Sequence, residues 1–409
     1  MLKCSVNYPA QKVAVLLRQF DFETVADAQN DIDLGNDYNP NLIVLSGAQL
    51  HLKTAPCIIE ALTARAASGF YGWTPSDLPA YLNAIQNWMQ TVRHYDIDKQ
   101  WIVPSYGTLK AISTAIRAFT NENDGIIIQS PVYVLYDRVL KNTKRKKVCN
   151  SLIYKDGHYE MDFENLENLM ARPENKLMIL CNPHNPIMDI WSEEDLRTVA
   201  ALAKQYGVIV VSDEIFAEHA FNGHEVIPYS TIPEAKDNCI ICTSIGKCFN
   251  FTGLSHSNII IPNEKVRQEY IAKRDADHYG SLDPFMYNAI IAAYSKEGKE
   301  WIDALLEFVS GNITIIKDFF DKYLPSVTIC RHSAGTLLWA DCRSLGYTED
   351  QIHEFLLNEA NVVVDRGSQY GVEGECFCRF QVGIPRSELE NALERLLNAL
   401  KRRGIVYDS

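Results

Sequence analysis

The sequence predicts an α/β protein with a large domain built on a mostly parallel sheet and a smaller C-terminal α/β domain. Two observations support this fold class. From about residue 55, short apolar runs that suit buried parallel strands alternate with helical patterns, as is typical of an open α/β sheet. After Pro284 the pattern changes to a long helical stretch followed by short strands. With 409 residues, 47% of them hydrophobic, the chain is long enough to bury a core in each domain.

The large domain is predicted to span residues 41–284. Residues 1–40, which precede it, show no strong periodicity and end in a turn-rich run, so they are predicted to form an N-terminal arm. The helices predicted for the large domain are residues 55–68, 77–95 and 109–119. The strands predicted for its parallel sheet are residues 125–129, 177–181, 208–212, 239–243 and 258–261.

The small domain is predicted to span residues 285–409. One helical pattern runs from Pro284 through about Tyr323. The elements predicted after it are strands at residues 337–341, 362–365 and 378–382 and helices at residues 348–359 and 386–402. These short strands between helices indicate a second, smaller α/β unit.

Composition and charge limit which molecules the protein is expected to bind and where it is expected to be located. The formal net charge of −13 argues against a nucleic-acid or anionic-membrane partner. The N-terminus lacks the basic-then-apolar run of a signal peptide, and no stretch approaches the roughly 18 apolar residues of a membrane span. The 11 cysteines are scattered, and their one CxxC pair, Cys239 and Cys242, lies inside an apolar run that suits a buried strand, so we expect free thiols and no metal site. We therefore expect a cytoplasmic protein that acts on a small molecule.

Asp213 and Lys247 follow two successive predicted strands, where ligands of parallel sheets bind. A carboxylate at the end of a buried strand is costly unless a cation meets it, and the protonated pyridine nitrogen of pyridoxal phosphate (PLP) would be such a cation. A lysine at the next strand end can form a Schiff base with the aldehyde of that cofactor. Taken singly, Asp213 could instead cap a helix and Lys247 could be a surface charge. The pair, 34 positions apart, indicates a PLP site more strongly than either residue.

Three further segments have residues that suit a ligand. Gly107 and Thr108 open a predicted helix, whose first N–H groups and positive dipole end suit a phosphate, although a plain cap is the alternative. Two prolines fix the loop of residues 182–186, so that Asn185 could face a ligand oxygen or belong to a structural turn. Arg379 lies inside an apolar strand and needs an anion, which could be a substrate carboxylate or an internal salt-bridge partner.

Together these segments resemble the fold type I PLP enzymes, the class I and II aminotransferases, and within them the cystathionine β-lyase-like group of the MalY/PatB type. The resemblance covers about residues 53–400 and implies the aspartate-aminotransferase fold with PLP as cofactor. Its markers are Tyr71-Gly72-Trp73-Thr74, Ser130-Pro131-Val132-Tyr133, the loop of residues 182–186 followed by Ile190-Trp191, Ser212-Asp213-Glu214-Ile215, Lys247 with Phe249-Asn250, and Pro385-Arg386.

The resemblance implies a role for each catalytic and substrate-binding residue. Lys247 would be the internal-aldimine lysine and the proton carrier at Cα. Asp213 would pair with the pyridinium nitrogen, and Tyr133 would stack on the ring. Asn185 would hydrogen-bond the 3-hydroxyl group of the ring and contact the substrate, whose carboxylate Arg379 would bind.

The resemblance also implies how the phosphate is held. The backbone groups of Gly107, Thr108 and Leu109, together with Ser244, would bind it. Tyr71 would reach the phosphate of the neighbouring subunit's cofactor, which implies a homodimer.

The sequence departs from the family pattern around the expected substrate. Phe216 stands where a His or Tyr is usual three residues after the Asp, and Gly246 precedes the lysine in place of Ser. Gln49 and His51 replace two acids in the segment of residues 46–52, which the resemblance places opposite the substrate side chain. Two other substitutions are Met188 for Gly and Gln381 for Asn. The cofactor residues are largely kept while the substrate wall is altered, which leaves room for a specialised biosynthetic substrate.

Three functions are compatible with these residues. The first is a C–S β-lyase, which eliminates a thiol from Cβ and releases pyruvate and ammonia. The second is an aminotransferase, which uses the same residues but returns the proton to the cofactor carbon. The third is a non-catalytic regulatory protein that keeps the fold, and the intact set of Lys247, Asp213 and Arg379 speaks against it.

Overall fold

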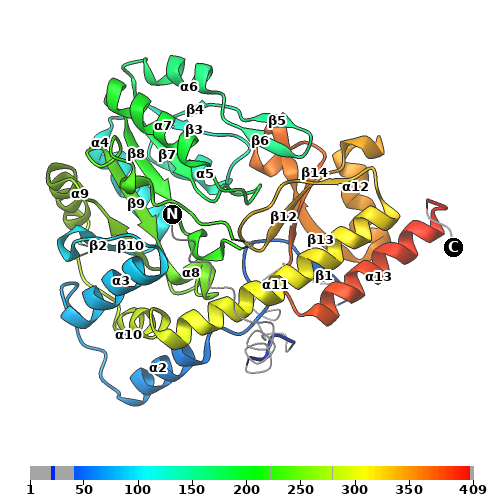
Figure 1. Ribbon diagram of the computed structural model, residues 1–409, viewed down its shortest axis with the longest axis horizontal. Coiled ribbons are helices and arrows are strands. Elements are labelled where there is room, and N and C mark those ends of the chain that lie inside the picture. The colour runs from blue at the N-terminus through cyan, green and yellow to red at the C-terminus, as the bar shows by residue number, and fades with distance from the viewer. Residues whose placement is uncertain (1–19, 24–40, 222, 279, 406–409) are drawn as a thin grey trace.

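The computed structural model of the chain describes residues 20–23, 41–221, 223–278 and 280–405 (Figure 1). The arm predicted for residues 1–40 lies outside the described residues except for residues 20–23. The described chain contains a seven-stranded sheet, a five-stranded sheet and a hairpin of β5 (Ile153–Lys155) and β6 (His158–Glu160). The predicted α/β fold class with a large, mostly parallel sheet is confirmed.

The seven-stranded sheet contains one strand whose direction was predicted wrongly. In sheet order its strands are β2 (Ile102–Ser105), β10 (Ser257–Ile260), β9 (Cys239–Thr243), β8 (Ile209–Asp213), β7 (Asn175–Cys181), β3 (Gly125–Ile128) and β4 (Lys146–Cys149). The last five are parallel, but β10 runs antiparallel to β9 and β2. The connection between β9 and β10 contains only the single-turn helix α8 (Ile245–Cys248), which is too short to carry the chain back for a parallel pairing.

Helices cover both faces of this sheet, because side chains along a strand alternate between the faces. From β7, Leu177 and Ile179 join the apolar cluster on one face, whereas Met178 and Leu180 join the cluster on the other. The first face is covered by α4 (Thr108–Phe119), α5 (Leu135–Asn142) and α9 (Glu264–Ala276). The second cluster includes α3 (Pro79–Val92), α6 (Phe163–Met170) and α7 (Glu193–Tyr206). Burial on both faces explains the continuous apolar runs of the strands.

The five-stranded sheet contains one strand from the beginning of the described chain and four strands from its last third. In sheet order its strands are β1 (Ile43–Leu45), β13 (Val362–Arg366), β14 (Phe377–Gln381), β12 (Leu337–Asp341) and β11 (Thr328–Ile329). β1 pairs in parallel with β13, with Ile43 opposite Val362. This corrects the assignment of these residues to the large domain, since the backbone of β1 finds its hydrogen-bond partners at the edge of the small sheet. The boundary near residue 284 stays a prediction.

The long helical pattern after Pro284 forms two helices rather than one. α10 (Pro284–Ala293) packs on α2 (Pro56–Ala67) and is capped by Asp283. The side chain of Ser295 then accepts a hydrogen bond from Gly298 N and starts α11 (Lys296–Tyr323) as a new helix. Figure 1 shows α11 running from α10 to the small sheet, where it lies beside α13 (Arg386–Arg402). Neither α11 nor another described helix is apolar enough over sufficient length to cross a membrane.

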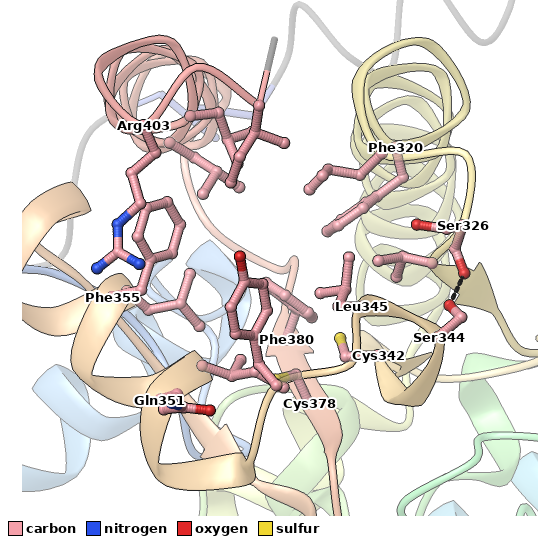
Figure 2. A pocket seen from close by; sticks show the side chains of 18 residues that line it. Phe320, Ser326, Cys342, Ser344, Leu345, Gln351, Phe355, Cys378, Phe380 and Arg403 are labelled. Carbon is pink, nitrogen blue, oxygen red and sulfur yellow. Dashed lines mark hydrogen bonds between the residues drawn. The ribbon is translucent and has the colours of Figure 1, made fainter.

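A cavity of about 280 Å³ lies in the small α/β unit, between α11, α13 and α12 (Glu349–Phe355), which continues into a π-helical turn (Leu356–Ala360). Figure 2 shows Phe320, Phe355 and Phe380 lining it together with Cys342 and Cys378. None of the residues that the sequence predicts for the site is in its lining. The cavity is therefore separate from the strand ends where the chemistry was predicted.

Candidate active site

The predicted residues converge at the carboxyl ends of three neighbouring strands. In the sheet register, Cys181 of β7 lies opposite Asp213 of β8, which in turn lies opposite Cys242 of β9. Asn185 lies in the loop after β7, and Lys247 lies on α8 after β9. Parallel strands end at one edge of their sheet, so this arrangement brings residues from three parts of the chain to one place.

Asp213 is a buried carboxylate held by a phenol. Its side chain is 3% exposed, and burial raises its pKa to about 6. Tyr136 donates a hydrogen bond to Asp213 Oδ2 at 2.6 Å, which lowers that pKa in part. Asp213 forms no ion pair with another described residue. A carboxylate in this state fits the protonated ring nitrogen of PLP.

Lys247 lies on α8, directly after β9. Ser244 caps α8 by accepting a hydrogen bond from Gly246 N at 3.0 Å. The Lys247 amine donates to Ala48 O at 3.0 Å and lies 5.9 Å from the centre of the Phe216 ring. Burial, and next the positive charge of Arg379, lower the pKa of Lys247 to about 8, although Asp213 acts in the opposite direction. A buried amine that is partly neutral near pH 8 fits a nucleophile for an aldehyde.

The start of α4 fits a phosphate group. Gly107, the residue before the helix, has φ +85°, and no side chain caps the first turn. The backbone N–H groups of Thr108 and Leu109, which open α4, are placed to bind an anion at this helix start. Thr108 Oγ1 lies 2.7 Å from Ser257 Oγ, and Ser244 Oγ donates to His256 O at 2.6 Å. The backbone N–H groups of Thr108 and Leu109 thus suit a phosphate, whereas the one hydroxyl proton of Ser244 is already donated to His256 O, and the phosphate roles stay predictions.

Arg379 forms an ion pair with a residue of its own chain and also contacts a residue of the strand-end loops. It is 3% exposed on β14 and forms an ion pair with Asp365 of β13. Its Nη1 donates to Asn185 Oδ1 at 2.9 Å, and its guanidinium carbon lies 4.6 Å from the centre of the Tyr370 ring. The internal salt bridge that the sequence left open is thus present, while the link to Asn185 joins Arg379 to the strand-end loops.

The two predicted tyrosines differ in their surroundings. Tyr133 lies edge-on to Tyr136, with ring centres 5.5 Å apart, and burial raises its pKa to about 12. Tyr71 is 54% exposed, stacks on Phe285 and donates a hydrogen bond to Ala66 O at 2.6 Å. Tyr133 therefore lies next to Tyr136, the residue that donates a hydrogen bond to Asp213. Tyr71 instead lies on the surface of the chain.

Sequence reasoning missed three residues of the site: Tyr136, Asp365 and Tyr370. The first falls in none of the predicted helices or strands, although its spacing of three residues from Tyr133 places both on one face of a helical turn. The other two needed the pairing of β13 with β14, which places Asp365 opposite Arg379.

The two substituted positions in the wall proposed for residues 46–52 differ in burial. His51 is 4% exposed, and burial lowers its pKa, which favours the neutral imidazole. Its backbone N–H donates a hydrogen bond to Gly383 O at 2.9 Å. Gln49 is exposed, and its carbonyl accepts a hydrogen bond from Gln381 Nε2 at 2.9 Å. The effect of both substitutions on such a wall stays a prediction.

A buried ion pair supports the loop that follows Asp213. Arg93 on the segment after α3 donates to Glu214 Oε2 at 2.7 Å, and the two side chains are 4% and 0% exposed. We expect Arg93→Ala to lower the free energy of unfolding by about 3–5 kcal/mol, because Glu214 would remain buried without its cation. Urea titration measures this loss. Arg197→Ala, which breaks an exposed pair with Glu193, serves as the control and should change little; equal effects would contradict the prediction.

Several known proteins match most of this chain. A family model described as aminotransferase class I and II matches residues 40–396. Cystathionine beta-lyase PatB of Bacillus subtilis is 34% identical over 354 residues, which are 86% of this chain and 91% of that protein. Protein MalY of Escherichia coli is 30% identical over 389 residues, 93% of this chain and 99% of that protein. The structure of cystalysin from Treponema denticola, which contains PLP, matches with a TM-score of 0.89 and 30% identity, covering 94% of this chain and 99% of that one.

Proposed function

The chain belongs to the aminotransferase class I and II family, and from that membership we propose that it is a PLP-dependent carbon–sulfur β-lyase. It would act on an S-substituted amino acid and release a thiol, pyruvate and ammonia. The single observation that best supports the proposal is that buried Asp213 and the desolvated amine of Lys247 lie after neighbouring strands at one edge of the sheet. The similarity to proteins named cystathionine beta-lyase favours elimination over transamination.

Each residue of the site has a task in this reaction. When bound, PLP supplies an aldehyde for the substrate amine and a ring that accepts electrons from the substrate Cα. Asp213 keeps the ring nitrogen protonated by pairing with it. Lys247 takes the proton from Cα, and its pKa of about 8 leaves a useful share of neutral amine near neutral pH. Loss of this proton allows the Cβ–S bond to break, with the electron pair leaving on sulfur, which takes up a proton to become the thiol. Water then hydrolyses the released unsaturated amine to pyruvate and ammonia.

An apolar cluster next to Lys247 excludes water from the site. Phe216, Met188 and Leu337 are buried together, with Ala48 and Ile215 packed against them. The Phe216 ring faces the Lys247 amine, so the departure from the family's His or Tyr supplies a wall without hydrogen-bonding groups. Such surroundings disfavour the charged amine and thus favour its action as a base.

The direct test of this function is product analysis. The purified holoenzyme is incubated with S-methylcysteine or cystathionine, and pyruvate and free thiol are measured. Equal amounts of both products are expected. Amino-group transfer to an added 2-oxo acid without thiol release would show an aminotransferase instead, and a protein that binds PLP but forms neither product would support a regulatory role.

Arg379 is proposed to bind the substrate α-carboxylate. We expect Arg379→Ala to lower kcat/KM by about 10- to 100-fold, because a hydrogen bond to a charged group contributes roughly 1.5–3 kcal/mol. Cystathionine should be a poorer substrate than S-methylcysteine, since Gln49 offers no charge for the distal ammonium. A panel of amino acids assayed with wild type and Arg379→Ala checks both points. If cystathionine is the best substrate, the prediction about Gln49 is wrong. If kcat/KM is unchanged in Arg379→Ala, the prediction that Arg379 binds the carboxylate is wrong.

A homodimer is proposed, with Tyr71 reaching the phosphate of the neighbouring subunit's cofactor. Its support is an exposed aromatic run, in which Phe70, Tyr71 and Trp73 are 67%, 54% and 76% exposed. Light scattering should give the mass of a dimer. Tyr71→Phe should weaken PLP binding several-fold, and the variant should remain a dimer. An active monomer at assay concentration would exclude this arrangement.

The compartment is proposed to be the cytosol. All ten cysteines of the described residues are free thiols, which is typical of a reducing environment. A small amino acid, rather than a nucleic acid or a membrane, is the proposed partner, given the net charge of −13.

A further inference from the structure

The hydrogen bonds of Arg379 leave a specific part of its guanidinium group available. An arginine has five N–H donors arranged along three edges of a plane. Asp365 Oδ2 accepts hydrogen bonds from both Nε and Nη2, which fills one edge. Asn185 Oδ1 accepts from Nη1. Within the described residues, one N–H on Nη1 and one on Nη2 remain.

Asp365 is itself held in place from the other side. The backbone N–H of Gly47 lies 3.0 Å from Asp365 Oδ2 and 3.2 Å from Oδ1. The next residue, Ala48, accepts the hydrogen bond from Lys247, so the backbone that fixes Asp365 also contacts the catalytic lysine. The Asp365 side chain is 15% exposed, and the Arg379 plane packs over Tyr370. The guanidinium is therefore fixed by Asp365 along one edge and by an aromatic ring across its face.

We propose that Asp365 is a positioning residue that determines which N–H groups of Arg379 bind a ligand carboxylate. It closes the Nε edge of Arg379 and directs a ligand carboxylate to the remaining N–H groups of Nη1 and Nη2. The ligand then binds end-on, next to Asn185, with Asp365 behind the arginine. This inference rests on the proposed function only in taking that carboxylate to be the α-carboxylate of an amino acid.

The role requires an oxygen acceptor at Asp365, not a negative charge. All three donors, Nε and Nη2 of Arg379 and the N–H of Gly47, reach the same atom, Asp365 Oδ2. Asparagine can place its single carbonyl oxygen there and keep the three bonds. Alanine removes the acceptor, and glutamate keeps the charge but moves it by one methylene group. The three substitutions therefore distinguish the effect of holding the Arg379 guanidinium in one orientation from the effect of the negative charge of Asp365.

The experiment measures binding of propionate, a carboxylate that the enzyme cannot turn over, to the holoenzyme by calorimetry. Asp365→Ala should raise the dissociation constant about tenfold, the effect of about one charge-assisted hydrogen bond. Asp365→Glu should raise it several-fold, and Asp365→Asn should leave it within about threefold of wild type or below it. In an Arg379→Ala background, Asp365→Asn and Asp365→Ala should have no further effect. Because propionate binding needs no turnover, this result is independent of whether the enzyme proves to be a lyase.

Asp341→Asn is the matched control. Asp341 lies in the same sheet and receives hydrogen bonds from Nε and Nη2 of Arg343, but that pair is not part of the strand-end site. Its replacement should leave propionate binding unchanged. An unchanged constant in both Asp365→Ala and Asp365→Glu would overturn the proposal. Asp365→Asn binding as weakly as Asp365→Ala would also overturn it, because charge rather than orientation would then be responsible. If Asp365→Ala does not fold, the Glu and Asn variants decide alone.

Discussion

Lys247→Ala is expected to abolish the borohydride-stable adduct between the chain and PLP and to lower kcat by at least about 10²–10⁴-fold. The variant loses the amine that attaches the cofactor and the base that takes the proton from Cα. No other lysine follows β9 at this edge of the sheet within the described residues. The effect should therefore be larger on kcat than on KM, because binding of the carboxylate by Arg379 is retained.

The adduct is measured by mass spectrometry of peptides after reduction with borohydride. In wild type the modified peptide should contain Lys247, and in Lys247→Ala no peptide should be modified. Lys236→Ala is a control in which the lost lysine is exposed and packs on Trp101, and both the adduct and the activity should remain. An adduct at another lysine in the variant would show that the assignment is incorrect.

Asp213→Ala should weaken PLP binding and lower kcat together. Removing one partner of a buried ion pair costs about 3–5 kcal/mol, which corresponds to roughly 10²- to 10³-fold or more in affinity. Equilibrium dialysis of PLP and single-turnover rates measure the two losses separately. Near-normal turnover at saturating PLP would show that another group keeps the ring nitrogen protonated.

The same carboxylate predicts a pH dependence of cofactor uptake. Because burial raises the pKa of Asp213 to about 6, the group is neutral below that pH and charged above it. PLP uptake by the apoenzyme should therefore fall as the pH drops below about 6. Tyr136→Phe removes a hydrogen bond that lowers this pKa, so the fall should begin at a higher pH. An unshifted profile in Tyr136→Phe would contradict the role of that hydrogen bond.

The residues proposed to bind the cofactor could be brought together from the sequence because they follow strands. Asp213 and Lys247 each come directly after a buried apolar run, and the edge where parallel strands end is shared. The fold class followed from the same alternation of strands and helices. The direction of β10 did not, because a short apolar run has the same pattern in a parallel and an antiparallel neighbourhood.

The residues behind Arg379 could not be predicted from local pattern. Asp365 is 14 positions from Arg379, and only the register of β13 against β14 shows that they face one another. The burial of His51 likewise depends on the contact of its backbone with Gly383, which is distant in sequence. A single sequence contains no direct signal for such non-local pairing, so the site near the substrate was less completely predicted than the site near the cofactor.

The parallel pairing of β1 with β13 has a consequence for synthesis on the ribosome. Residues 46–361, 316 residues in all, separate the two strands. At about 5–20 residues per second, β1 emerges roughly 15–60 s before its partner. The strands of the seven-stranded sheet are complete by Ile260 and can pair during that interval. The nascent chain therefore has an unpaired apolar segment, Ile43–Leu45, until Val362–Arg366 has been made, and chaperones that hold short apolar segments are expected to bind it during that time.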